Sequence, residues 1–340
     1  MAPRVLFLHG NGEDYLADSL LHGLRTVLGA ACVDAPRRDA LYDDLTDAGR
    51  AALYGHGFTL YGRLPEVDVD RQWPLERARR GEFDVVVVGD VHRNWGPWVW
   101  LRSHLRQLRE HGTAVAVLDG GDGEVVYPYG PTWWKRMRPW PLLRAHGRVA
   151  MYKRELTPKG AWIRYGGVVP PPLADRLLRR HVRPIAFSIP EEHVADGAEE
   201  RTRLLPTQVI DPELARLVGA VDRYAFDREA DYHADLRASR FGVTMKKAGW
   251  DALRHYEVAA SGAIPCVRDL HAKPPHCAPH GLRDGVNCIA YADARALLSR
   301  IEAMGAEEEA RLRAGTLEWA RANTTTARAR AFLASLGPAA

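Results

Sequence analysis

Cysteine and long apolar runs are both scarce in this sequence. Four of its 340 residues are cysteine, too few for the disulfide framework of a small secreted protein. No apolar stretch approaches the ~20 residues that a membrane-spanning helix needs. The apolar run of residues 5–8, after Arg4, ends too soon for a signal peptide. These absences predict a reduced, cytoplasmic protein.

Charge of one sign is not concentrated either. The formal net charge is only +4 over the whole chain. A nucleic-acid-binding protein normally gathers basic residues on one face, so this balance predicts no nucleic-acid partner. The length exceeds that of one ordinary domain and suits two.

Three motifs that would assign a chemistry are incomplete. Gly10 and Gly12 do not complete the glycine fingerprint of a nicotinamide cofactor site. Residues 7–10 (FLHG) are similar to the oxyanion loop of α/β-hydrolases, but no serine of the chain lies in a G-x-S-x-G sequence. That class is therefore a remote alternative. The histidines and cysteine of residues 271–280 lack a second pair that would close a four-ligand site, so we predict no metal.

Short apolar runs alternate with amphipathic segments along the first half of the chain. We expect strands near residues 4–8, 31–34, 58–64, 84–88, 114–118 and 149–152. We expect helices near residues 15–28, 71–80 and 97–111. This alternation predicts a parallel sheet with right-handed crossovers. Ligands of such sheets bind beyond the carboxyl ends of the strands.

The second half repeats the alternation after a proline-rich break between residues 165 and 184. We expect strands near residues 185–189, 241–244, 263–267 and 287–290. We expect helices near residues 211–218, 229–238, 251–260, 293–304, 307–323 and 327–336. The prediction is an α/β protein with two Rossmann-like domains, residues 1–175 and 176–325, and a C-terminal helix and tail, residues 326–340.

The stretch of residues 241–267 joins a strand, a loop with two lysines, a helix and a second strand. Asp251 is expected to cap the helix or to supply its first-turn acid. A helix N-terminus attracts phosphate through its unpaired N–H groups and partial positive charge. Because Lys246 and Lys247 come just before it, the loop predicts a phosphate site.

Arg254 and Glu257 lie three residues apart in the same helix, so they share one face. One helical turn is about 5.4 Å, close to the separation between the phosphates and the ribose hydroxyls of a nucleotide. The spacing predicts that Arg254 holds phosphate and that Glu257 accepts from ribose hydroxyls. A helix-surface salt bridge between the two residues is the alternative.

This stretch resembles the C-terminal donor-site motif of GT-B glycosyltransferases, and especially that of bacterial CgeB-like and exostosin-like members. The motif is a glycine-tryptophan-aspartate loop, then Arg-x-x-Glu, a small-residue turn and Ile-Pro. The matching residues are Gly249, Trp250, Asp251, Arg254, Glu257, Gly262, Ile264 and Pro265. Residues 4–36 and 152–156 carry a weaker likeness. The resemblance implies two Rossmann-like domains that face across a cleft, with terminal helices that often cross back to the first domain.

The resemblance also implies an activity. A nucleoside diphosphate sugar would bind through Lys246, Lys247, residues 249–251, Arg254 and Glu257. Its sugar, of the hexose type, would pass to a hydroxyl or amine of a small-molecule or glycan acceptor, with no metal and no other cofactor. Many GT-B enzymes have an acid at the position of Gly249, so that sugar contact is not predicted here. A non-catalytic nucleotide-sugar-binding protein would carry the same motif and is the alternative.

A catalytic base is expected in the first domain, near the carboxyl end of a strand. Asp90 and His92 follow the valine-rich strand and rank first, ahead of Asp14 and then His9. Asp14 has the alternative of a helix cap, and His9 that of a loop histidine bonded to the backbone. Asp18 lies a turn deeper in its helix.

Residues 127–148 combine three tryptophans with prolines, glycines and basic residues. Aromatic faces pack on sugar rings and on lipid interfaces alike. A basic surface loop, an acceptor-facing flap and a membrane-adjacent flap therefore stay open as interpretations. The sequence does not indicate an oligomeric state.

Overall fold

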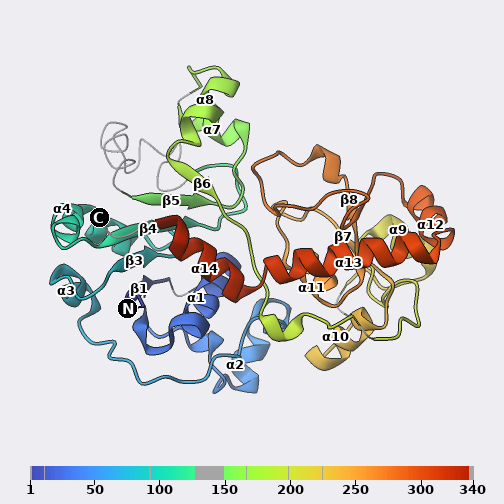
Figure 1. Cartoon of the computed structure of the whole chain (residues 1–340), viewed down its shortest axis with the longest axis horizontal. Coiled ribbons are helices and arrows are strands. Elements are labelled where there is room, and N and C mark those ends of the chain that lie inside the picture. The colour runs from blue at the N-terminus through green and yellow to red at the C-terminus, as the bar shows by residue number, and fades with distance from the viewer. Residues whose placement is uncertain are drawn as a thin grey trace.

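The computed structural model describes residues 2–10, 12–91, 93–126, 149–165, 167–197, 199–223 and 225–336. Its strands form two parallel sheets, one from each half of the chain (Figure 1). His92 and the tryptophan-rich segment 127–148 lie outside the described residues. Within the described part, no helix combines the length and the apolar character that crossing a membrane requires.

The first sheet has the strand order β2-β1-β3-β4-β5-β6, and all neighbouring strands are parallel. Its strands are β1 (Val5–Leu8), β2 (Cys32–Ala35), β3 (Val85–Val88), β4 (Ala114–Asp119), β5 (Ala150–Lys153) and β6 (Val182–Pro184). All four valines of β3 are buried, as expected for a strand covered on both faces. The order reverses between β1 and β3, so the crevice beyond their carboxyl ends is a topological switch point.

Helices connect the strands of this sheet. They are α1 (Tyr15–Leu28), α2 (Asp47–Ala51), α3 (Pro74–Arg79), α4 (Trp95–Glu110), α7 (Pro158–Arg164) and α8 (Pro171–Leu178). The apolar residues Leu16, Leu20 and Leu24 recur at helical spacing on α1 and are all buried. The helix begins after Asp14, whose carboxylate accepts the N–H of Ala17 at 2.9 Å. The predicted amphipathic helix is therefore present, with its first turn capped.

The second sheet has the order β7-β8-β9 and is also parallel. Its strands are β7 (Phe241–Thr244), β8 (Ile264–Arg268) and β9 (Ile289–Tyr291). The helices of this half are α9 (Pro212–Val218), α10 (Glu229–Arg237), α11 (Leu253–Ala260), α12 (Ala294–Glu302) and α13 (Ala306–Ala322). Phe241, Val243 and Ile264 are fully buried in its core.

The last helix, α14 (Thr325–Leu336), returns to the first half of the chain and packs on α1 (Figure 1). Gly23 permits the close approach, because a Cβ there would lie 2.0 Å from the Thr325 carbonyl oxygen. His22 Nδ1 lies 3.0 Å from the Thr325 hydroxyl. The crossing of the C-terminal helix back to the first domain is therefore confirmed.

Two predicted strands are absent. Residues 58–64 form turns, since Thr59 has a φ of 78° and Gly62 one of 71°, which no extended strand allows. Residues 185–188 are not a strand either, because the chain leaves the first sheet after β6. The predicted limits of the domains stay a prediction, but β6 belongs to the first sheet although it follows residue 175.

Candidate functional site

The loop between β7 and α11 places two lysines before a helix N-terminus. Lys246 and Lys247 are exposed, and the Lys246 ammonium lies 5.2 Å from the centre of the Trp250 ring. Ala252 precedes the helix and supplies no side-chain cap. The first N–H groups of α11 therefore lack the side-chain acceptor that a polar cap would supply, and such an end favours an anion.

Asp251 does not cap α11, so that prediction is wrong. Its carboxylate instead accepts the backbone N–H of Phe187 and the hydroxyl of Tyr256, both at 2.8 Å. The residue is only 4% exposed. Burial raises the pKa of Asp251 to about 6, although the Arg154 guanidinium opposes the change. Asp251 thus ties the loop to the segment that connects the two sheets.

Position 249 has no room for the acid that many GT-B enzymes carry there. A Cβ on Gly249 would lie 2.5 Å from Glu155 Oε1. Glu155 follows β5, and its two oxygens accept the N–H of Asp251 at 3.0 Å and the thiol of Cys277 at 2.7 Å. Arg154 donates to the carbonyl oxygen of Asp251 at 2.8 Å. A carboxylate from the first half of the chain therefore fills this space and fixes the loop.

Arg254 and Glu257 lie together on α11, but they do not form the salt bridge that was the alternative. The hydroxyl of Tyr232 lies between them: it accepts from Arg254 Nη1 at 2.9 Å and donates to Glu257. Arg254 Nη2 donates to the carbonyl oxygen of Gln208 at 2.8 Å. Among the described residues, Arg254 has no carboxylate partner, and its buried Nε has no acceptor. Its positive charge is therefore not neutralised by an ion pair.

Three side chains of metal-ligand type meet beside α10. Ligand atoms of His193, Glu229 and His233 lie within 4.8 Å of one another. However, the Arg63 guanidinium already binds Glu229, and His193 Nε2 donates to the carbonyl oxygen of Thr59 at 2.8 Å. Burial, followed by the neighbouring His233 and Arg63, lowers the pKa of His193. A cation would have to displace both the arginine and Thr59, so these contacts argue against a metal.

A cavity of 710 Å³ lies at the switch point of the first sheet. It is lined by the ends of β1 and β2 and by the starts of α3 and α4. The polar and glycine positions in its wall include His9, Gly10, Gly12, Arg71, Arg93 and Asn94. A site at this place matches the crevice in which parallel sheets bind ligands.

His9 lines this cavity with both ring nitrogens close to backbone oxygens. Nδ1 lies 2.8 Å from the carbonyl oxygen of Gly10, and Nε2 lies 2.6 Å from that of Pro36. A carbonyl only accepts, and a neutral imidazole has one N–H to give. The single N–H can therefore serve only one of the two carbonyls, but both ring nitrogens lie against backbone oxygens, which supports the backbone-bonded alternative for His9.

Arg93 brings Asp90 and Asp14 together. Its Nε lies 2.9 Å from an Asp90 oxygen, and its Nη2 lies 3.7 Å from an Asp14 oxygen. Asp14 also caps α1. Asp18 is almost fully buried; its carboxylate is ion-paired with Arg38 at 2.8 Å and accepts the backbone N–H of Asp14 at 3.2 Å. Two of the predicted base candidates, Asp14 and Asp90, thus share one arginine beyond the carboxyl ends of β1 and β3.

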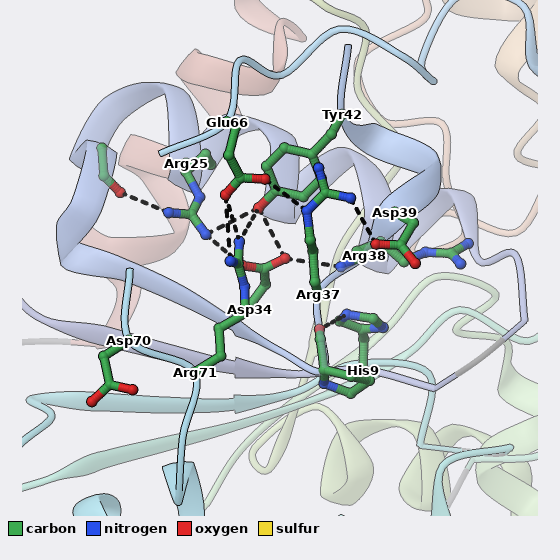
Figure 2. Close-up of polar contacts among 12 residues, drawn as sticks. His9, Arg25, Asp34, Arg37, Arg38, Asp39, Tyr42, Glu66, Asp70 and Arg71 are labelled. Atoms are coloured by element: carbon green, nitrogen blue, oxygen red, sulfur yellow. Dashed lines mark hydrogen bonds and ion pairs between the residues drawn. The ribbon is translucent and has the colours of Figure 1, made fainter. Parts of the chain in front are cut away.

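Arg71 is a cavity residue that the sequence reasoning missed. Its Nε donates to Asp34 at 3.1 Å and its Nη2 to the hydroxyl of Tyr42 at 3.0 Å (Figure 2). Asp34 is fully buried at the end of β2 and is also paired with Arg25. Burial alone would raise the pKa of Asp34, but the Arg38 N–H and the two guanidinium groups lower it. This network holds Arg71 at the cavity wall. The sequence signal for it was Asp34, an acidic residue within an otherwise apolar strand.

No protein-family model and no curated protein matches the sequence. Solved structures resemble it in fold. A structure of Alr3699/HepE from Anabaena in complex with UDP is 10% identical, with a TM-score of 0.50 over 98% of this chain and 99% of that chain. HepE in complex with UDP and glucose has 9% identity, the same coverage and a TM-score of 0.50. A UDP-forming α,α-trehalose-phosphate synthase from Burkholderia xenovorans has 14% identity and a TM-score of 0.48, with full coverage of both chains.

The likeness to HepE extends over nearly the whole chain and agrees with the two parallel sheets and the returning C-terminal helix. The narrower likeness to CgeB-like and exostosin-like proteins stays a prediction. The protein has the GT-B fold that was expected from its sequence.

Proposed function

We propose that this protein is a glycosyltransferase. It moves a hexose from a nucleoside diphosphate sugar to a hydroxyl or amine of a small-molecule or glycan acceptor, without a metal. The donor binds at the N-terminus of α11, through Lys246, Lys247, Arg254 and Glu257. The acceptor binds in the cavity at the switch point of the first sheet.

The observation that carries this proposal is that the positive charge of Arg254 has no ion-pair partner among the described residues. It is a half-buried guanidinium whose hydrogen bonds within the described chain go to a hydroxyl and a carbonyl oxygen, and it lies 5.2 Å from the centre of the Tyr232 ring. The Arg254 guanidinium can bind the diphosphate of a nucleotide, and the buried Glu257, about one helical turn away, can accept from its ribose hydroxyls. The complexes of HepE with UDP and with UDP and glucose support the same ligand class, since HepE shares the fold.

The chemistry needs the negative charge of the departing diphosphate to be balanced. Arg254, the two exposed lysines and the uncapped start of α11 supply fixed positive charge and N–H donors there. Glu257 is an acceptor for the ribose hydroxyls. These groups take the place of a divalent cation, which is why we propose a metal-independent reaction.

Calorimetry of the full chain with UDP tests the donor site. Arg254→Ala should weaken UDP binding by about 1.5–3 kcal/mol, the range for a hydrogen bond to a charged group. Arg216→Ala is the matched control, because Arg216 is an exposed arginine on α9 whose Nε donates to the carbonyl oxygen of Pro212 in the same helix. Equal UDP affinity in both variants and the wild type would remove Arg254 from the site.

A non-catalytic nucleotide-sugar-binding protein is the second candidate. The specific observation in its favour is that Asp14, Asp90 and His9 all have partners already, namely Arg93 and two backbone carbonyls. An assay for UDP release from UDP-glucose, with and without a panel of alcohols and amines, separates the two candidates. Tight binding without any release favours the binding protein.

A further inference from the structure

Thr59 has an unusual backbone and lies at the junction of the two halves of the chain. Its φ is 78°, a left-handed conformation that a β-branched residue rarely adopts. Surrounding groups hold it there. Its N–H donates to Glu229 at 2.7 Å, and its carbonyl oxygen accepts from His193 and from Arg63, both at 2.8 Å. Strain of this kind persists only where neighbours over-determine it, and it concentrates at ligand sites and switches.

The hydroxyl of Thr59 is directed at Glu257. It donates to Glu257 Oε1 at 2.6 Å, while the hydroxyl of Tyr232 donates to Oε2. His233 Nε2 lies 3.3 Å from the Thr59 hydroxyl oxygen. Thr59 is fully buried and Glu257 is 7% exposed. Each carboxylate oxygen of Glu257 therefore already accepts a hydrogen bond from a hydroxyl of the chain, and little of the residue is exposed.

We propose that the Thr59 hydroxyl occupies the place of a nucleotide's ribose hydroxyl on Glu257, so that the chain closes its own donor site. This inference rests on the proposed function of Glu257. Threonine and ribose both offer a secondary alcohol, so the same oxygen can accept from either but not from both in this buried position. The contact between the two halves of the chain and the binding of a nucleotide are then mutually exclusive.

The competition has a thermodynamic consequence. The apparent affinity for a nucleotide equals the intrinsic affinity multiplied by the fraction of molecules in which Thr59 does not cover Glu257. Removing the Thr59 hydroxyl weakens the covered state and leaves Glu257 free for the ribose. Thr59→Val keeps the β-branched shape, but its methyl group cannot approach a carboxylate oxygen at 2.6 Å. Thr59→Ser keeps the hydroxyl and is the matched control.

Calorimetry on the full chain tests the competition with UDP and with 2′,3′-dideoxyuridine diphosphate, which lacks both ribose hydroxyls. T59V should bind UDP about tenfold more tightly than the wild type, equal to about 1.4 kcal/mol. T59S should bind like the wild type. The dideoxy probe should gain less than UDP from T59V, because it has no hydroxyl for Glu257. If T59V does not fold, Thr59→Ala, which removes the same hydroxyl from Glu257, provides the same comparison.

The outcomes separate this inference from the proposed function. If UDP binds the wild type through Arg254 but T59V binds it no better, the competition is wrong and the donor site stands. An equal gain for UDP and the dideoxy probe also overturns it, since the effect is then a general loosening. If neither the wild type nor T59V binds UDP or another nucleoside diphosphate, the inference and the proposed function both fail. Binding of UDP by T59V alone supports both.

Discussion

Replacing Asp251 with asparagine should change how the stability of this protein depends on pH. Asp251 is buried, and burial raises its pKa to about 6 from an ordinary value of 3.8. The charge of Glu155 adds to this rise, while Arg154 and the hydrogen bonds from Phe187 and Tyr256 oppose it. The folded protein therefore holds this proton more tightly than the unfolded chain does.

The sign follows from that difference. Below about pH 4 the Asp251 carboxyl is protonated in both the folded and the unfolded protein, so it does not change the free energy of unfolding. Between about pH 4 and about pH 6 the unfolded chain releases this proton while the folded protein keeps it, so the free energy of unfolding falls as the pH rises. The gap between about 6 and 3.8, at about 1.36 kcal/mol for each pKa unit, amounts to about 3 kcal/mol. This loss is complete by about pH 7.

Asp251→Asn removes the titrating group while keeping both contacts. The amide oxygen can accept the Phe187 N–H, and the amide NH₂ can donate to the Tyr256 hydroxyl oxygen. The free energy of unfolding, measured by denaturant titration from about pH 4 to about pH 8, should shift in favour of the variant by about 3 kcal/mol across that range.

Tyr256→Phe is the companion variant, because it deletes a hydrogen bond that lowers the pKa of Asp251 and should therefore enlarge the loss of stability on raising the pH. Parallel pH profiles for the wild type and Asp251→Asn would refute the reasoning. They would mean that Asp251 titrates alike in the folded and unfolded states.

Three further predictions concern packing, metal and the base. Gly23→Ala should lower the free energy of unfolding by about 1–3 kcal/mol, because its Cβ would meet the Thr325 carbonyl oxygen. Denaturant titration measures the change. Gly96→Ala on α4 is the control, since the space around a Cβ there is open. Turnover should survive EDTA, and its loss with rescue by manganese or magnesium would disprove a metal-independent reaction. Asp14→Asn or Asp90→Asn should lower turnover by about a hundredfold with UDP affinity unchanged if that residue is the base; near-normal turnover in both excludes them.

Much of the fold could be predicted because its signals are local. The apolar runs of β1, β3 and β4 are buried on both faces of the first sheet, so nearly every residue in them had to be apolar. The periodicity of α1 marked its buried face, and Asp14 marked its start. The extended prediction for residues 58–64 failed because the left-handed backbone of Thr59 is imposed by partners far along the chain.

The candidate site divides in the same way. Arg254 and Glu257 were expected on one face of a helix, because helical geometry places residues three apart side by side whatever the rest of the chain does. Their partners could not be expected. Thr59 lies 198 residues from Glu257 in the sequence, and Glu155 reaches the loop of Gly249 from the other sheet. Periodicity encodes which residues are neighbours within an element, whereas these contacts depend on how the two sheets and their connecting segments pack together.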